Sequence, residues 1–124
     1  MSSRPLPTDA ELEILTALWA RGCATVREVQ QALPREAGYT TVLKLMQIMH
    51  AKGLVRRDES ERTHVYEAAF RREDTERGLV GDLARRAFGG SAGRLVMRAL
   101  SERTASPEEI AEIRRLLDEA ERGR

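Results

Sequence analysis

Residues Tyr39 to Glu67 read YTTVLKLMQIMHAKGLVRRDESERTHVYE, and their pattern predicts a helix followed by two strands. In the first part of this stretch the apolar residues recur at i, i+3, i+4 and i+7, the spacing of one face of an α-helix. A helix is therefore expected from Tyr39 or Thr40 to Lys52, with Gly53 as its end. The residues expected to face inward are Val42, Leu45, Met46 and Met49.

The second part of the stretch predicts a β-hairpin. Its two segments, Leu54–Asp58 and Arg62–Glu67, contain β-branched and aromatic residues that suit strands. Glu59-Ser60-Glu61 separates the segments, which predicts a polar tip of three residues.

Two helices are expected before this stretch, because two capping boxes precede it. In such a box a Thr side chain and a Glu three residues later satisfy free N–H groups at the start of a helix. The boxes are Thr8–Glu11 and Thr25–Glu28. Gly22 and Pro34 are expected to end these helices, and Trp19 is expected in the core.

Three more helices are expected after Phe70. Gly89-Gly90 separates the first from the second, and the third opens with Ser106 as its N-cap and Pro107 at its first position. Each carries an apolar stripe. The stripe residues expected at an interface between two copies are Leu79, Leu83, Leu95, Leu100, Ile110, Ile113 and Leu117.

This order predicts a mainly α protein of two parts. Residues 1–70 have the pattern of a winged helix–turn–helix, three helices followed by a β-hairpin wing, and residues 71–124 form a helical dimerisation region. A module of this size cannot cover three apolar stripes, and contiguous exposed apolar surface on that scale is rare in monomers. A homodimer is therefore expected.

Composition fits a folded protein of the cytoplasm. Apolar residues make up 41% and charged residues 33% of the chain, unlike a disordered sequence. Cys23 is the single cysteine, so no internal disulfide can form, which fits a reducing compartment. No apolar run approaches the ~20 residues that span a bilayer, and no hydrophobic signal segment is present, so no membrane partner is expected.

Charge is distributed unevenly. The whole chain has 21 basic and 20 acidic residues, a net charge of +1. Residues 39–72 have seven Lys/Arg and four Asp/Glu (+3), whereas residues 73–124 have ten and eleven (−1). The local basic excess coincides with the predicted helix and hairpin, where it favours a nucleic-acid partner. A solvated surface of mixed charge is the alternative.

The helix from Tyr39 to Lys52 is the candidate DNA-reading element. No acidic residue occurs in it, although about one residue in six of the chain is acidic. Its outward side chains can meet base edges in the major groove, and residues of its first turn can meet phosphate. The candidates on the helix are Thr40, Thr41, Lys44 and Gln47, and those on the hairpin are Arg56, Arg57, Arg62 and His64.

Simpler interpretations of both elements remain open. The helix could be an ordinary amphipathic helix with a solvated outer face, and the hairpin a stabilising element with solvated arginines. A winged helix can also act as a protein–protein interaction module without specific DNA binding. Salt dependence of binding distinguishes the last case, because only DNA binding releases condensed counterions.

No catalytic, metal or cofactor site is indicated. The two histidines, His50 and His64, lie in separate elements, and Cys23 has no metal-ligating partner nearby in the sequence. Cys23 is interpreted as a small structural residue. Enzymatic activity is not expected.

The sequence resembles the penicillinase repressor (BlaI/MecI/CopY) family over nearly its whole length. The resemblance rests on Leu6–Glu13, Ala24–Val29, Tyr39–Gln47 and Lys52–Arg57, together with His64–Tyr66 and Ser106–Ile110. It implies a homodimeric transcriptional repressor on a palindromic operator. It also implies that Thr40, Thr41, Lys44 and Gln47 lie on the DNA-reading surface.

Three departures from the family pattern bear on mechanism. Ile48 stands where a basic residue is common, so the resemblance implies the loss of one DNA contact there. The Asn-Phe bond at which the β-lactamase repressors are cut is replaced by Arg98-Ala99, so a sensor protease partner remains unknown. No cysteine follows Cys23, which excludes the cysteine-rich metal motif of the copper-responsive branch.

Overall fold

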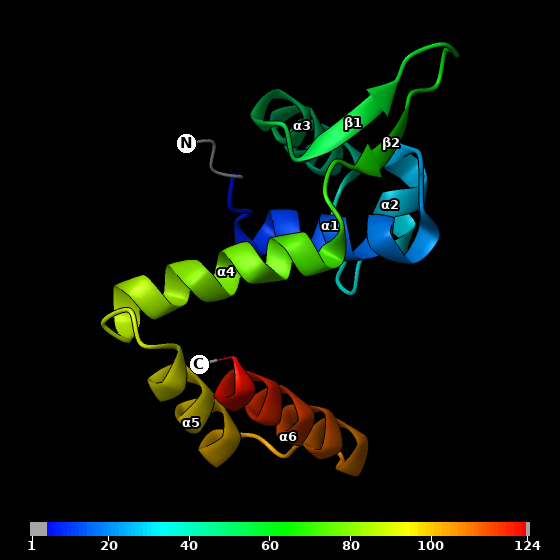
Figure 1. Cartoon of the computed structure of the whole chain (residues 1–124). Helices are drawn as coiled ribbons and strands as arrows, with labels where there is room; N and C mark the ends of the chain where they lie inside the picture. Colours follow the sequence, from blue (N-terminus) through cyan, green and yellow to red (C-terminus); the bar gives the residue numbers. More distant parts are fainter. Residues whose placement is uncertain (1–4, 124) are drawn as a thin grey trace. The chain divides into compact units, whose positions relative to one another are not determined.

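The computed structural model describes residues 5–123 of the chain. The chain divides into two compact units, Met1–Val80 and Gly81–Arg124. The elements are α1 (Asp9–Arg21), α2 (Val26–Ala32), α3 (Tyr39–Lys52), β1 (Val55–Asp58), β2 (Val65–Ala68), α4 (Arg72–Ala87), α5 (Ala92–Glu102) and α6 (Pro107–Arg122) (Figure 1). This order confirms the predicted fold class, a mainly α chain with three helices and a hairpin wing followed by further helices.

The predicted helix caps are present. Thr8 and Thr25 each accept a hydrogen bond from the backbone N–H three residues on, and Glu11 and Glu28 reach back to the cap residue. Ser106 and Glu109 form a third box at the start of α6. Gly53 ends α3 at φ 84°, a left-handed conformation that an L side chain rarely adopts.

The core of the N-terminal unit lies between α1, α2, α3 and the hairpin. The predicted inward residues Val42, Met46 and Met49 of α3 are fully buried, and Leu45 is partly buried against the core. They pack with Ile14, Leu15, Leu18, Val29, Leu54, Val55 and Tyr66. Trp19 is partly buried beside this core, where its Nε1–H donates to the Phe70 carbonyl at 3.0 Å.

The hairpin has shorter strands and a longer loop than predicted. β1 pairs with β2 so that Val55 faces Ala68 and Asp58 faces Val65, which leaves a loop of residues 59–64 rather than a tip of three. Two contacts fix this register. The buried Tyr66 exchanges both backbone hydrogen bonds with Ala24, and the Asp58 carboxylate accepts the Ser60 N–H at 2.9 Å, which turns the chain as β1 ends.

The helices that follow have little core of their own. In α4, Thr75 and Ala84 are buried, and Gly78 lies close to Leu6, since a Cβ at that position would be 3.3 Å from the Leu6 side chain. Neither α5 nor α6 buries a residue in the single chain. Within residues 5–123 no helix is both long and apolar enough to cross a membrane.

Candidate nucleic-acid interface

The outward face of α3 is continuous and exposed. Its exposed side chains at helical spacing are Thr40, Thr41, Lys44, Gln47, Ile48 and Ala51. No acidic residue lies on α3, and Lys44 makes no ion pair within the part of the chain that the structure describes. All four helix residues proposed from the sequence therefore lie on one solvent-facing surface.

Two of the four hairpin candidates are neutralised by neighbours. The Arg56 Nε lies 3.2 Å from Glu67 on the opposite strand. The Arg57 guanidinium lies 2.6 Å from Glu59 and over the Tyr66 ring. Hydrogen bonds to Tyr66 and Glu59 raise the pKa of Arg57 above its usual range and hold the side chain in place. These arginines are less available to an external phosphate than the sequence suggested.

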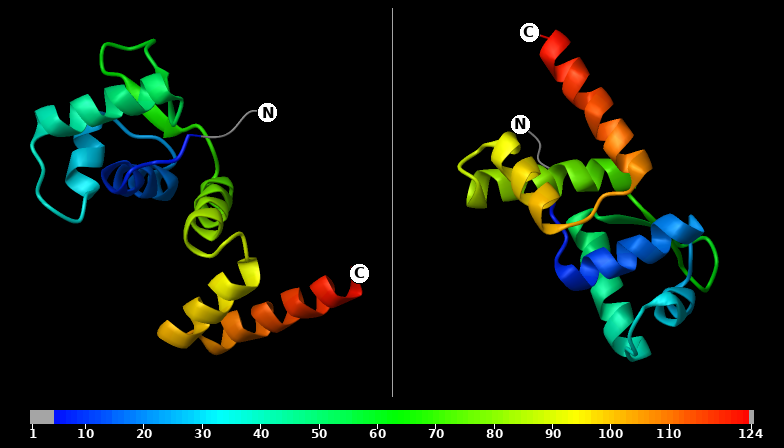
Figure 2. Two further views of the ribbon diagram at one scale, coloured as in Figure 1. Left: turned by 90° about the vertical axis from the view of Figure 1, so that its left-hand side faces the viewer. Right: turned by 90° about the horizontal axis from the view of Figure 1, so that it is seen from below.

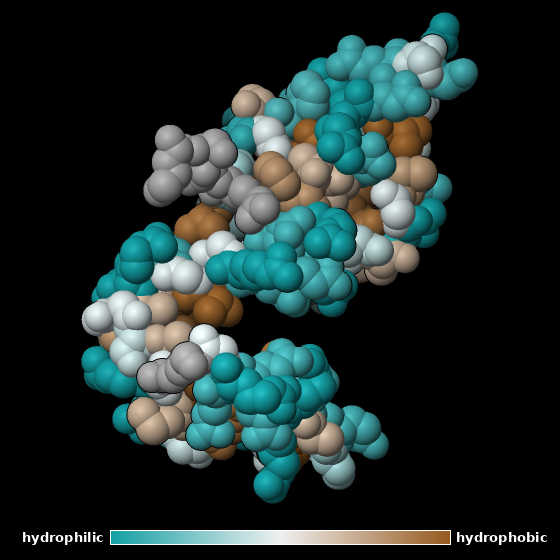
Figure 3. Space-filling model, in the orientation of Figure 1, coloured by the Kyte–Doolittle hydropathy of each residue, from teal (hydrophilic) through white to brown (hydrophobic). Residues whose placement is uncertain are grey.

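Arg62 and His64 lie in the loop of the wing, not in the second strand as predicted. Arg62 is exposed and has no ion-pair partner among residues 5–123, whereas His64 is half-buried. The wing projects beyond the helices of the N-terminal unit (Figure 2), and its far end is covered by hydrophilic residues (Figure 3). Arg62 is therefore the free cation of the wing.

A groove of about 310 Å³ lies between the wing, α2 and α3. It is lined by Thr25, Val26, Arg27, Tyr39, Leu43, Arg62, Thr63, His64 and Tyr66. Among these lining residues, the Arg27 guanidinium lies over the Tyr39 ring, 4.8 Å from the ring centre. Sequence reasoning did not select Arg27 or Tyr39, although the position of Arg27 in the first turn of α2 was a usable signal.

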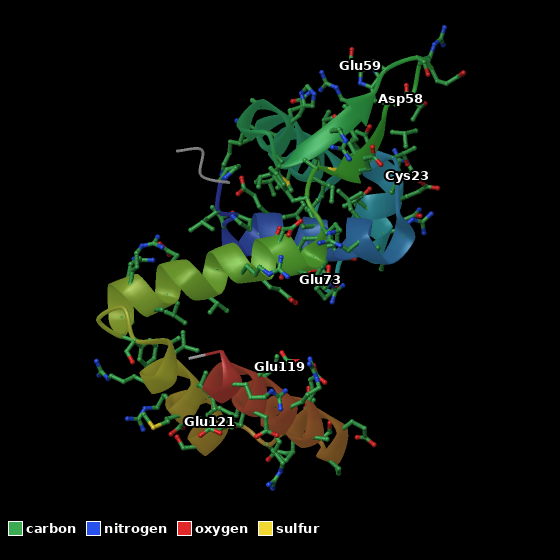
Figure 4. The ribbon with its side chains drawn as sticks, in the orientation of Figure 1. Cys23, Asp58, Glu59, Glu73, Glu119 and Glu121 are labelled. Atoms are coloured by element: carbon green, nitrogen blue, oxygen red, sulfur yellow. The ribbon has the colours of Figure 1, made fainter. Side chains whose placement is uncertain are left out.

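The wing as a whole carries no basic excess. Its residues 55–68 contain three arginines (56, 57 and 62) against four acids (58, 59, 61 and 67). Figure 4 shows Asp58 and Glu59 toward the far end of the hairpin and Cys23 nearer its base. Cys23 is exposed there, not packed in the core. The positive charge available to a ligand comes chiefly from Lys44, Arg27 and Arg62.

An ion pair ties α3 to α1. Lys52 Nζ lies 2.8 and 2.9 Å from the two carboxylate oxygens of Glu11, which is only 2% exposed. Burial raises the pKa of Glu11, but hydrogen bonds from Lys52 and Thr8 and the Lys52 charge outweigh it, so the net pKa is lowered. The pair joins the start of α1 to the last turn of α3.

The interface residues proposed for a second copy lie on α4, α5 and α6. Leu83, Leu100 and Leu117 are exposed, and Leu79, Leu95, Ile110 and Ile113 are half-buried. Val80, Val96, Met97 and Leu116 are also exposed, with Met97 at 65%. The Arg98–Ala99 bond lies inside α5, not in a loop.

No group of three or more His, Cys, Asp or Glu side chains within residues 5–123 is placed to hold a metal ion.

The three helices and the hairpin form a winged-helix domain, and α3 presents an exposed face without acidic residues. The family model described as penicillinase repressor matches residues 7–119. The transcriptional regulator BlaI of Mycobacterium tuberculosis, strains CDC 1551 / Oshkosh and ATCC 25618 / H37Rv, is 32% identical over 118 residues, covering 93% of this chain and 85% of the relative. The chain belongs to the penicillinase repressor family.

Proposed function

We propose that this regulator represses transcription by binding a palindromic operator as a homodimer, with α3 in the major groove. The observation that carries the proposal is the outward face of α3: six exposed residues, no acid and an unpaired Lys44. Base edges in the major groove present acceptors to Lys and both donors and acceptors to Gln and Thr. An acid on this face would repel the phosphates, and none is present.

Lys44 and Gln47 are assigned to base edges. They lie three residues apart, so they are neighbours on the same helical face. Thr40 and Thr41 lie in the first turn, where free backbone N–H groups also attract phosphate. Lys44 lies in the N-terminal half of α3, and Gln47 lies just past its middle. Other helix–turn–helix proteins likewise place a recognition helix in the major groove.

The phosphate backbone is contacted beside these residues. Arg62 of the wing and Arg27 of α2 line one groove and neither has a carboxylate partner within residues 5–123. Arg56, Arg57 and His64 are assigned a weaker share, because the two arginines are already paired and His64 is half-buried. Phosphate contacts fix the register and orientation of the protein without reading sequence.

The homodimer is assigned to residues 71–124, and the DNA-binding region to residues 1–70. α5 and α6, of 11 and 16 residues, bury nothing in one chain, although helices owe most of their stability to packing of an apolar face. A second copy related by a two-fold axis presents the same apolar patch, so each copy covers the exposed patch of the other. Such a dimer presents two copies of α3 to half-sites one helical turn or a multiple apart. As a transcriptional regulator the protein acts in the cytoplasm.

The proposal is tested by selecting duplexes from a random pool with the full chain. A palindromic consensus is expected, and Lys44→Ala should weaken binding to it. Arg77→Ala is the matched control, since it removes one exposed basic side chain from α4, away from α3 and the wing. Failure to enrich any sequence, or equal effects of the two variants, would overturn the proposal.

A further inference from the structure

Ile48 is an unusual residue on the face proposed to read DNA. It is 43% exposed, while the neighbouring exposed residues Lys44 and Gln47 are polar. A large aliphatic side chain cannot donate or accept a hydrogen bond. If Ile48 lies against a base edge, it displaces the water bound to that edge. The donor or acceptor of most bases is then left without a hydrogen-bond partner, which costs free energy.

The thymine 5-methyl group is the one apolar feature of the major-groove edge. A methyl group placed against Ile48 gains from burial on both sides and leaves no polar group unsatisfied. Cytosine at the same position presents an amino donor and lacks the methyl. The chemistry of Ile48 therefore selects thymine.

Ile48 lies on the side of α3 that is away from the wing. Leu43 borders the groove shared with the wing, and Ile48 follows five residues later, about 140° further round the helix. Lys52, one turn beyond Ile48, is paired with Glu11 of α1. Ile48 therefore lies on the edge of the outward face that is away from the wing, with Lys44 one turn before it and Ala51 one turn after it on the helix surface.

The family resemblance implies the loss of a contact made by a basic residue at this position. We infer that Ile48 makes a different contact instead, and is a specificity-determining residue that meets a thymine methyl in each half-site of the operator. The inference rests on the proposed function and adds to it one named base feature. α3 itself carries no acidic residue, and the Glu11 carboxylate that reaches Lys52 is buried and paired. A protein partner for Ile48 has no comparable support, because no other exposed large aliphatic residue lies on the outward face of α3.

The test uses the full chain and the palindromic duplex that it selects from a random pool. Each thymine is replaced in turn by uracil, symmetrically in both half-sites, which removes the methyl group and keeps the base pair. At one thymine position the wild-type protein should lose about fourfold in affinity per half-site, the effect of one buried methyl group. Ile48→Ala should lose this sensitivity, and Ile48→Val should keep part of it.

Arg77→Ala serves as the control and should show the wild-type uracil profile. The inference is wrong if no thymine methyl affects binding, or if the sensitive position stays equally sensitive in Ile48→Ala. In either case the selected duplex still binds, so the proposed function stands. If no duplex is selected at all, the proposed function fails, and the assignment of Ile48 fails with it.

Discussion

Replacing Lys52 with Met should destabilise the N-terminal unit by about 2–3 kcal/mol. Methionine keeps most of the apolar stem but removes the ammonium group that bonds both oxygens of Glu11, at 2.8 and 2.9 Å. A hydrogen bond to a charged group contributes ~1.5–3 kcal/mol, and breaking a fully buried pair costs ~3–5 kcal/mol. The Lys52 side chain is 36% exposed, so the pair is not fully buried and water can solvate part of the Glu11 carboxylate in the variant. The expected destabilisation is therefore about 2–3 kcal/mol, below the range for a fully buried pair.

The assay is urea unfolding followed by Trp19 fluorescence at pH 7. Trp19 reports on this unit because it packs beside the core and its indole N–H bonds to Phe70. Arg77→Met is the matched control. It breaks an exposed ion pair with Asp74, whose contribution is about 0–1 kcal/mol.

The dependence on pH gives an independent check. The pKa of Glu11 is lowered in the folded protein, so its stabilising effect is full above the unfolded pKa of about 4.3 and is lost as pH falls through the folded value. Without Lys52, the hydrogen bond and the charge that lower the pKa of Glu11 are lost, so its folded pKa lies above the wild-type value. The difference in unfolding free energy between the two proteins should therefore shrink between pH 7 and pH 3. A difference below about 0.5 kcal/mol at pH 7, or one that is constant down to pH 3, would refute the reasoning.

Four further outcomes are expected. Lys44→Ala should weaken operator binding by ~1–3 kcal/mol and relax the preference at one base pair. Competition with single-base operator variants measures both effects, and an equal loss on all sequences would reassign Lys44 to a phosphate contact. Arg62→Ala should reduce the slope of log affinity against log salt by about 1 per wing bound, whereas Arg56→Ala should change it less because Arg56 is paired with Glu67; equal changes would contradict this difference. Leu117→Asp should shift full-length protein from dimer to monomer in sedimentation, and an unchanged dimer would remove α6 from the interface. A fragment ending at Val80 should fold as a monomer and hold a palindromic site ~10²–10⁴-fold less tightly than the full chain; a dimeric fragment would show that pairing does not need α5 and α6.

Much of the N-terminal unit could be predicted because its signals are local. The capping boxes at Thr8 and Thr25 each need only two residues in a short stretch, and both are present. The same local signal at Ser106 predicted the start of α6 in the C-terminal unit. The inward stripe of α3 follows from helical periodicity alone. The fold class followed from these elements in order.

The hairpin register could not be obtained in this way. One contact beside it, the pairing of Tyr66 with Ala24, joins residues more than forty positions apart in the chain. The charge of the candidate site also depends on contacts that the sequence does not show. The sequence shows that Arg56 and Arg57 are basic, but it does not show that Glu67 and Glu59 lie against them, or that Arg27 and Arg62 share a groove.

Operator binding through α3 and its positive charge underlies the proposed function. It is tested most directly by titrating the full chain against its selected palindrome and against a scrambled duplex, over a series of salt concentrations. Binding to the palindrome should be at least ~10³-fold tighter than to the scrambled duplex, and log affinity should fall linearly as log salt rises. Equal affinity for the two duplexes, or an affinity that does not change with salt, would contradict it.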